Sequence, residues 1–484
     1  MEWSYVLGWS LNIIIVMNFL LAVFVIFIER RDAATTWAWL LVLFFLPVIG
    51  FIIYLFFGRQ LKKDNFYNLS VEEQTFFNQQ VDQQIEEIRH KKSGVEDAFL
   101  NKYEQLIKLN LRSSQSLISL QNKTQVLHDG EQKFAALLKD IRSAQHEINI
   151  QYYIIKRDSL GRKILEALVE RAKAGVKVRL LYDAVGSRTL KLKDFKDLLA
   201  NNGEVRVFFP PLLGIINLRL NNRNHRKVCI IDGKVGYVGG FNVGNEYLGQ
   251  DKRFGYWRDT HLRIEGDVVP DLQQRFIFDW NYAGNGKNKE DTFAFVSHQI
   301  EDYSPMQIVT SGPNSHSEHL KNMMIKLIMS AEHDIYIQTP YFIPDKSFMD
   351  ACRTALLSGV NMNIMIPGNP DHPFVFWASR SFLGELLQYG AKVYFYEKGF
   401  LHAKTLVVDS EVSTVGTTNL DARSFRLNFE INALIYNERT ALELESHFET
   451  DTAGSRLFTK EMYAERKWTE KFKEGISSLL SPIL

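Results

Sequence analysis

One eighteen-residue stretch occurs twice in this 484-residue chain. Residues 225–242 read HRKVCIIDGKVGYVGGFN, and residues 402–419 read HAKTLVVDSEVSTVGTTN. At an offset of 177 positions, seven of the eighteen residues are identical. The identical pairs are His225/His402, Lys227/Lys404, Asp232/Asp409, Val235/Val412, Val238/Val415, Gly239/Gly416 and Asn242/Asn419. Because the chain has 12 histidines in all, a histidine repeated with its whole surroundings indicates an internal duplication.

The duplication extends upstream of both motifs. The similar segments are 141–155 with 328–343, and 168–183 with 352–367. In each copy, β-rich runs alternate with segments of helical pattern that end in glycine turns, which predicts α/β units. We expect mixed, mostly parallel sheets flanked by helices in two repeats, residues 124–290 and 291–484, packed as a pseudo-two-fold unit. The polar stretch 284–291 is the expected boundary.

Two apolar stretches precede the repeats. Residues 5–28 and 37–57 contain no charged side chain, and each is long enough to cross a hydrocarbon core about 30 Å thick. A cleaved signal peptide fits poorly because the leading residues carry Glu2 and no basic residue, and because a second apolar stretch follows. We expect a transmembrane helix hairpin over residues 1–60 and a helical connector over residues 61–123.

The charges beside these stretches bear on orientation. Arg30 and Arg31 lie between the two stretches, and Arg59, Lys62 and Lys63 follow the second. Basic residues close to membrane spans are more frequent on the cytoplasmic side. We therefore expect a multi-pass protein of the cell membrane whose catalytic portion is cytoplasmic.

The repeated motif predicts a β-hairpin that gathers polar side chains. Residues 228–231 form a short apolar run, and Asp232-Gly233 predicts a two-residue turn. In that register, paired residue numbers sum to 465, which places Gly240 opposite His225. The gathered side chains are His225, Lys227, Gly240 and Asn242 in the first repeat, and His402, Lys404, Thr417 and Asn419 in the second.

Such a group of residues suits a phosphodiester. Lysine and asparagine side chains can hold its non-bridging oxygens, glycine permits close approach, and histidine can attack phosphorus or transfer protons. A single histidine at a strand start is more often structural, but the duplication supplies two histidines for opposite sides of one phosphorus. We expect Gly240, Thr417, Asn242 and Asn419 to bind the substrate phosphate.

The motif groups Asp232 and Asp409 with the catalytic residues, but their spacing argues against contact with the histidines. Seven residues of extended strand cover about 23 Å at ~3.3 Å per residue. We expect both carboxylates to cap turns or to form structural ion pairs. The histidines need other carboxylates to orient them, and Asp259 and Glu430, downstream of the two motifs, are the candidates. The alternative for both acids is an exposed position at a strand edge.

Charge and the remaining motifs limit the possible partners. The net charge of +1 gives no global nucleic-acid footprint. Between Arg219 and Asp259, however, eight basic residues stand against four acidic ones, which favours either an anionic-lipid surface or a solvated basic face. The apolar stretches 208–218 and 372–383 are candidates for contact with a bilayer, with core packing as the alternative. The pair His316 and His319 has no further ligands nearby, so we expect no metal site.

The two complete motifs resemble those of the phospholipase D superfamily, whose signature is H-x-K-x-x-x-x-D followed by a glycine-rich tail that ends in asparagine. The order of hairpin, connector and two repeats is similar to that of the bacterial cardiolipin synthase family. This resemblance implies transfer of a phosphatidyl group between two phosphatidylglycerol molecules, through a phosphatidyl-histidine, to give cardiolipin and glycerol. It also implies His225 as nucleophile and His402 as general acid/base, with no cofactor. The residues themselves do not distinguish the two histidines.

Other functions fit parts of this pattern. A phospholipase D hydrolase, or another phosphatidyltransferase such as a phosphatidylserine synthase, would use the same residues. A nuclease of the superfamily has no need of two apolar stretches and favours a more basic chain. A membrane-anchored lipid-binding or scaffold protein would be supported by a degraded motif, and neither copy is degraded. We therefore expect an anionic phospholipid and a membrane as partners, and no nucleic acid; the oligomeric state is not predicted.

Overall fold

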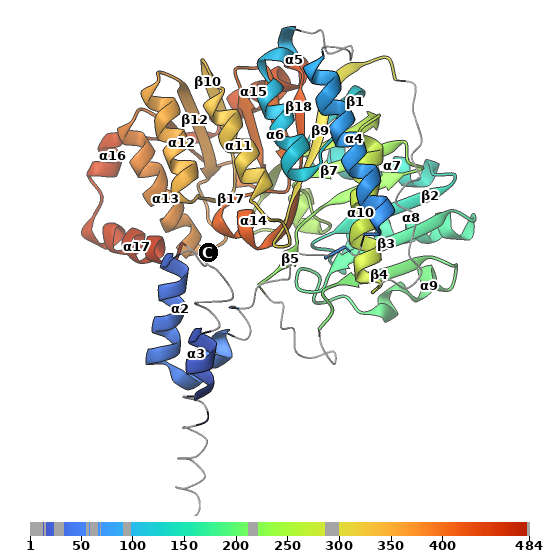
Figure 1. Ribbon diagram of the computed structural model, residues 1–484, viewed down its shortest axis with the longest axis horizontal. Coiled ribbons are helices and arrows are strands. Elements are labelled where there is room, and N and C mark those ends of the chain that lie inside the picture. Colours follow the sequence, from blue (N-terminus) through green and yellow to red (C-terminus); the bar gives the residue numbers. More distant parts are fainter. Residues whose placement is uncertain are drawn as a thin grey trace, which may run out of the picture.

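Each repeat of the protein is built on its own mixed sheet with helices on its faces (Figure 1). The computed structural model describes residues 13, 16–23, 33–54, 58, 66–67, 69–90, 98–211, 221–285 and 300–481. The first sheet has the order β4-β3-β2-β6-β7-β8. Its strands are β2 (Glu147–Tyr152), β3 (Lys177–Asp183), β4 (Glu204–Phe208), β6 (Val228–Ile231), β7 (Val235–Gly239) and β8 (Tyr256–Gly266).

The second sheet repeats this arrangement as β13-β12-β10-β15-β16-β18. Its strands are β10 (Asp334–Gln338), β12 (Asn361–Pro367), β13 (Lys392–Tyr396), β15 (Thr405–Val408), β16 (Val412–Gly416) and β18 (Asn428–Tyr436), with β19 (Ser455–Phe458) added beside β13. The equal strand order confirms the duplication. In each six-stranded set, two pairings are parallel and three are antiparallel, so the expected predominance of parallel pairs is wrong. The hairpin of each motif supplies the antiparallel pairs.

Two further strands join the sheets. Strand β1 (Ile118–Asp129) pairs with β8 along most of its length and with β9 (Tyr303–Ser311) at its start. Strand β9 in turn pairs with β18, so β8 and β18 both have a further strand beside them. The segment 118–123 is therefore strand, not the end of the helical connector. The remainder of the connector contains α4 (Val71–Arg89), α5 (Ala98–Lys102) and α6 (Glu104–Ser114).

Helices cover the faces of both sheets and close the hydrophobic core (Figure 1). In the first repeat they are α7 (Gly130–Ser143), α8 (Ser159–Lys173), α9 (Lys196–Leu199) and α10 (Val269–Ala283). In the second they are α11 (His319–Met329), α12 (Lys346–Leu357), α13 (Pro373–Gln388), α14 (Ala422–Arg426), α15 (Glu438–Thr452), α16 (Lys460–Ala464) and α17 (Trp468–Leu479). Phe208 and Phe209, from one stretch considered for bilayer contact, are buried against Phe429. Core packing is thus the correct interpretation for that part, and residues 212–218 lie outside the described residues.

Two apolar helices lie at the N-terminal end of the described chain. Helix α2 (Ala33–Phe45) and helix α3 (Pro47–Ile53) project from the body at the bottom of Figure 1. Pro47 begins α3, where its missing N–H costs no helical hydrogen bond. Among the residues that the structure describes, none belongs to a helix both long and apolar enough to cross a membrane. Much of the first expected span, residues 5–28, lies outside the described residues.

The motif hairpins differ from the predicted register by one residue. Lys234 N–H donates to the Ile231 carbonyl at 2.9 Å, so the predicted tight turn is present. Val228 nevertheless pairs with Val238 and Ile231 with Val235, so paired numbers sum to 466 instead of 465. The second hairpin shows the same pairing, from Thr405 with Val415 to Val408 with Val412. One extra residue after the turn produces this shift, which the turn sequence alone does not reveal.

Asp232 and Asp409 hold the turn ends of these hairpins to the sheets. The Asp232 carboxylate accepts hydrogen bonds of 2.7–2.9 Å from the backbone N–H groups of residues 145, 146 and 147. Asp409 binds the backbone of residues 332, 333 and 334 in the same way, at 2.8–2.9 Å. Both aspartates also adopt positive φ values, of 53° and 52°. Their placement among the catalytic residues is therefore corrected: the carboxylates anchor the start of β2 and β10.

We expect replacement of Asp232 by alanine to destabilise the fold. Three backbone donors lose their acceptor and alanine must adopt a left-handed conformation, which together cost about 2–4 kcal/mol. Thermal unfolding of the full chain in detergent measures this loss. Asp232→Asn is the matched control, because it keeps one acceptor oxygen and tolerates positive φ. If Asp232→Asn kept native stability but lost all activity, the Asp232 carboxylate would have a catalytic role instead.

Candidate active site

Each motif histidine is positioned by a strand of the other repeat. The short strand β5 (Arg223–Asn224) precedes His225 and pairs in parallel with the start of β18, in the second repeat. The strand β14 (Gly399–Leu401) precedes His402 and pairs in parallel with the start of β8, in the first. The backbone N–H of His225 then donates to the Phe429 carbonyl at 3.0 Å, and that of His402 to the Arg258 carbonyl at 2.7 Å. The residue that follows each of these carbonyl groups carries a carboxylate: Glu430 follows Phe429, and Asp259 follows Arg258.

Each candidate orienting carboxylate contacts a motif histidine, and the contacts are crossed between the repeats. Glu430 lies 3.0 Å from Nδ1 of His225, and Asp259 lies 2.6 Å from Nδ1 of His402. Both acids are fully buried, so the alternative of exposed strand-edge positions is excluded. A carboxylate on Nδ1 fixes the imidazole tautomer and directs Nε2 away from it. Each repeat thus supplies the histidine of one pair and the carboxylate of the other.

Burial and charge keep both histidines neutral in the free protein. Burial lowers the pKa of His225 to about 4, although Glu430 opposes the shift. Burial, reinforced by the charge of Lys404, lowers the pKa of His402 to about 3, and Asp259 opposes this shift. Lys404 also lowers the pKa of His225, and Lys227 lowers that of His402, so each motif lies within electrostatic range of the other. The two half sites therefore form one site.

The motif lysines are buried cations beside the histidines. Nζ of Lys227 donates to the His225 carbonyl at 2.7 Å, and Nζ of Lys404 to the His402 carbonyl at 2.5 Å. Burial lowers the pKa of Lys227 to about 7 and that of Lys404 to about 8, while Glu430 and Asp259 limit these shifts. A buried ammonium with its solvation shell removed binds an anionic oxygen strongly.

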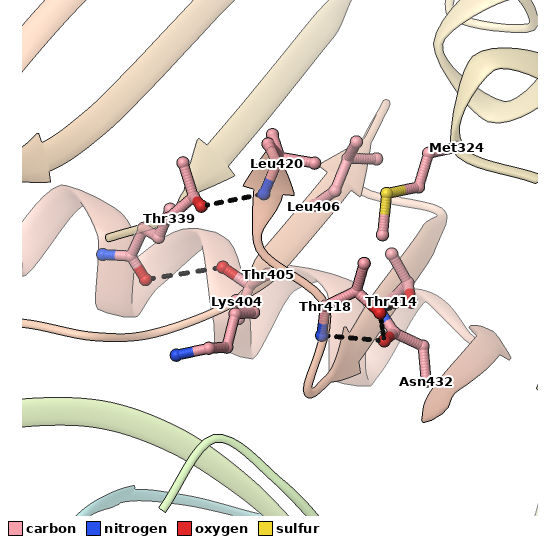
Figure 2. A pocket seen from close by; sticks show the side chains of 10 residues that line it. Met324, Thr339, Lys404, Thr405, Leu406, Thr414, Thr418, Leu420 and Asn432 are labelled. Atoms are coloured by element: carbon pink, nitrogen blue, oxygen red, sulfur yellow. Dashed lines mark hydrogen bonds between the residues drawn. The ribbon is translucent and has the colours of Figure 1, made fainter. Parts of the chain in front are cut away.

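A small cavity in the second repeat is lined in part by Lys404 (Figure 2). Its volume is about 10 Å³. Figure 2 shows hydrogen bonds in its wall, among them the bond from Leu420 N–H to Thr339 and those from Thr418 to Asn432. The hydroxyl of Thr418 donates to Asn432 Oδ1 at 2.7 Å. These bonds fix the loop between β16 and Asn419, from which the motif asparagine projects.

Gly240 and Thr417, at equivalent positions of the two motif tails, lie against the carboxylates of Asp259 and Glu430. The Thr417 hydroxyl donates to Glu430 at 2.5 Å and is fully buried. At the equivalent position, a Cβ on Gly240 would lie 1.9 Å from Oδ1 of Asp259, so glycine leaves the space that this carboxylate occupies. The expectation that the Thr417 side chain binds phosphate is corrected, because its hydroxyl donates to Glu430. The binding of phosphate by the Gly240 backbone is also not supported, since its N–H donates to the Thr260 carbonyl at 2.9 Å.

The two asparagines differ in their partners. Asn242 accepts from Ile154 N–H at 3.2 Å and donates to the Tyr247 hydroxyl at 3.1 Å. An amide nitrogen carries two hydrogens, so one donor of Asn242 remains for a ligand. Oδ1 of Asn419 is buried and, within the described part of the chain, has no hydrogen-bond partner. Phosphate binding by both asparagines stays a prediction.

Sequence reasoning missed two buried networks that support the site. Gln151 in β2 donates to Asp279 and Gln338 in β10 donates to Asp451, each at 2.8 Å. Asp279 also binds Arg226 at 2.6 Å, and Asp451 binds Arg258 at 2.8 Å. Both glutamines occur in the duplicated segments upstream of the motifs, in NIQY and YIQT, which is the signal that identifies them. Their partners, Asp279 of α10 and Asp451 of α15, lie in helices whose sequences share no motif. The hydrogen bonds between the glutamines and these aspartates could therefore not be predicted.

Comparison with known proteins identifies the family. The family model described as "Cardiolipin synthase, PLD-like domain" matches residues 137–266 and 324–452, more than half of the chain. The chain belongs to the cardiolipin synthase family. A second model, described as "Phospholipase_D-nuclease N-terminal", matches residues 16–59. Together the two matches follow the order of parts that the sequence predicts for a cardiolipin synthase of the phospholipase D superfamily.

Individual members of the cardiolipin synthase family are similar over nearly the whole chain. The major cardiolipin synthase ClsA of Bacillus subtilis (strain 168) is 50% identical over 479 residues, which cover 98% of each protein. The cardiolipin synthase of Listeria innocua is 47% identical over 480 residues, covering 99% of each. Among solved structures, a phosphatidylserine synthase from Haemophilus influenzae superposes with a TM-score of 0.60 at 15% identity, covering 79% of this chain and 96% of its own. This last likeness confirms the fold.

The lysine pKa values predict an alkaline limit to activity. Rising pH removes the ammonium protons of Lys227, with a pKa of about 7, and Lys404, with a pKa of about 8, and so weakens the hold on an anionic substrate. We expect kcat/KM to fall as pH rises through this range, and the fall in kcat to lie at higher pH, because a bound phosphate keeps both lysines charged. Measurement of kcat and kcat/KM against pH with the purified full chain gives both falls. A kcat/KM that stays constant from about pH 6 to about pH 9 would contradict the assignment.

Proposed function

We propose that this member of the cardiolipin synthase family transfers a phosphatidyl group from one phosphatidylglycerol to another, producing cardiolipin and glycerol. The observation that supports this proposal most directly is the crossed pair of buried histidine–carboxylate contacts, flanked by two buried lysines. The comparisons supply the second support, because its relatives across several genera bear the name cardiolipin synthase.

The first step forms a covalent intermediate. Nε2 of His225, neutral and oriented by Glu430, attacks the phosphorus of the donor lipid, so a P–N bond forms while the P–O bond to the departing glycerol breaks. His402 donates a proton to that glycerol oxygen. The approach of an anionic phosphodiester, together with Asp259, favours the imidazolium form of His402 that this step requires. Lys227 and Lys404 stabilise the charge on the non-bridging oxygens.

The second step reverses these roles on a new alcohol. His402, now neutral, accepts the proton of the free hydroxyl of a second phosphatidylglycerol, whose oxygen attacks phosphorus. The new P–O bond forms, the P–N bond breaks and His225 regains its lone pair. Oδ1 of Asn419, which has no hydrogen-bond partner among the described residues, is a suitable acceptor for a second hydroxyl of the glycerol headgroups. The two steps return the protein to its starting state and use only its side chains and two lipid molecules.

We further propose that the N-terminal segment is a transmembrane hairpin and that the repeats lie in the cytoplasm. The apolar side chains of α2 and α3 support this, because Phe44 is 78% and Phe45 69% exposed, and Ile49 and Ile52 are also exposed. Exposed apolar surface of this extent is unfavourable in water and favourable in hydrocarbon. The basic residues beside the two apolar stretches support the cytoplasmic side.

The proposal predicts the products of the purified full chain acting on phosphatidylglycerol vesicles. We expect cardiolipin and free glycerol in equal amounts, and a loss of at least ~10³-fold in rate for His225→Ala and for His402→Ala. Thin-layer or mass-spectrometric analysis of the lipids measures the products. Phosphatidic acid without cardiolipin would identify a hydrolase, and full activity in both alanine variants would exclude the shared site.

The assignment of the two histidines has its own test. Rapid quenching of a reaction with labelled phosphatidylglycerol, followed by peptide mass spectrometry, locates the phosphatidyl group on the chain. We expect the label on His225, and a label on His402 would exchange the roles of the two residues.

A further inference from the structure

The last helix of the described chain carries its apolar side chains on the outside. Trp468, Phe472, Ile476 and Leu479 of α17 are 75%, 59%, 39% and 82% exposed. Their spacing of four, four and three residues places them in one stripe along the helix. A helix on the surface of a water-soluble domain normally turns such a stripe toward the core. The apolar face of α17 therefore has no partner in the described part of the chain.

The opposite face of α17 is polar and binds the protein. Glu470 lies 2.9 Å from Arg380 of α13, and the buried Glu474 lies 3.3 Å from Arg380 and 3.0 Å from Arg466. Ser477 is also buried on this side. Ion pairs thus fix the rotation of α17 about its axis and hold the apolar stripe outward. The stripe is a feature of the docked helix, not of a frayed end.

Basic residues border the stripe on both sides. The exposed Lys471 and Lys473 lie at helical positions on either side of it, and Lys467 stands just before the helix. An apolar stripe edged with lysines is the arrangement of helices that lie in the interface of an anionic bilayer, with ammonium groups at headgroup level. A second copy of the chain is a poorer occupant, because a symmetric contact would bring the lysines of both copies together.

The surroundings of α17 extend this surface toward the active site. Helix α13, on which α17 packs, begins beside Asp371 and exposes 54% of Phe374 in its first turn. Asp371 binds the Tyr341 hydroxyl at 2.5 Å and lies within electrostatic range of Lys404. In Figure 1, α17 lies at the lower edge of the second repeat, the end of the body from which α2 and α3 project. The apolar stripe, the start of α13 and the N-terminal helices thus share one end of the molecule.

We propose that α17 lies flat in the interface of an anionic bilayer and orients the catalytic repeats toward the membrane surface. Trp468, Phe472, Ile476 and Leu479 enter the acyl-chain boundary, while Lys467, Lys471 and Lys473 contact lipid phosphates. The start of α13 then faces the headgroups from which the substrate is drawn. The catalytic consequence rests on the proposed function, whereas the placement of the helix does not.

Spin labels on the full chain test the placement directly. In vesicles of phosphatidylglycerol, a label on Phe472→Cys or Ile476→Cys should be accessible to oxygen and protected from a water-soluble nickel chelate. Leu357→Cys is the matched control: Leu357 is a 73% exposed leucine at the end of α12, outside the stripe, and its label should show the reverse. Access of the chelate to the labels of α17 would overturn the proposal. So would dipolar broadening between labels of neighbouring chains, which would identify a second copy as the occupant.

The activity of a second variant separates this surface from the catalytic machinery. Phe472→Glu/Ile476→Glu should lower the rate on phosphatidylglycerol vesicles by about tenfold, since the two charges oppose entry into the interface. Its rate on monomeric short-chain phosphatidylglycerol should stay within about twofold of the wild type, and Leu357→Glu should leave both rates unchanged. An equal loss on both substrates would overturn the proposed orienting role. Protected labels on a wild-type chain that makes no cardiolipin would support the placement while rejecting the proposed function.

Discussion

The hydrogen bond from each imidazole to a carboxylate of the other repeat is the contact on which this site depends. It requires β5 to run along β18 and β14 along β8, so the two sheets must meet with their motif ends facing each other. Within the described residues, neither repeat alone supplies both the motif histidine and the carboxylate that contacts it. The duplication therefore does not produce two independent sites. It divides each pair of histidine and carboxylate between the two repeats.

Burial gives this arrangement its chemical character. The same loss of solvent that lowers the pKa values of the histidines also lowers those of Lys227 and Lys404, and the two carboxylates limit both effects. The free site thus holds two neutral histidines beside two lysines, and an anionic lipid stabilises the charge of these lysines. The negative charge of a substrate phosphodiester offsets the positive charges of Lys227 and Lys404. In the arrangement that we propose for α17, its outward apolar stripe places this site beside the membrane that supplies the lipid.

The repeat in the sequence predicted the two α/β repeats and the position of Asp232 at a turn, because these follow from period and spacing. Asp259 and Glu430 were identified as partners of the histidines from their places after the motifs. Their crossing could not be predicted, since it depends on how the repeats pack. The one-residue shift of the hairpins and the use of Thr417 by Glu430 also depend on local geometry, which a turn sequence leaves open. The networks of Gln151 and Gln338 stayed hidden because their partners lie on distant helices.

Proton NMR of the two imidazole Nδ1–H groups tests the crossed arrangement most directly. A histidine that donates from Nδ1 to a buried carboxylate gives a resonance far downfield of the other protons. Glu430→Gln should remove or shift the signal that His225→Ala removes, and Asp259→Asn should affect the signal that His402→Ala removes. If Glu430→Gln instead altered the His402 signal and left that of His225 unchanged, each histidine would be paired within its own repeat, and the interleaved site described above would be wrong.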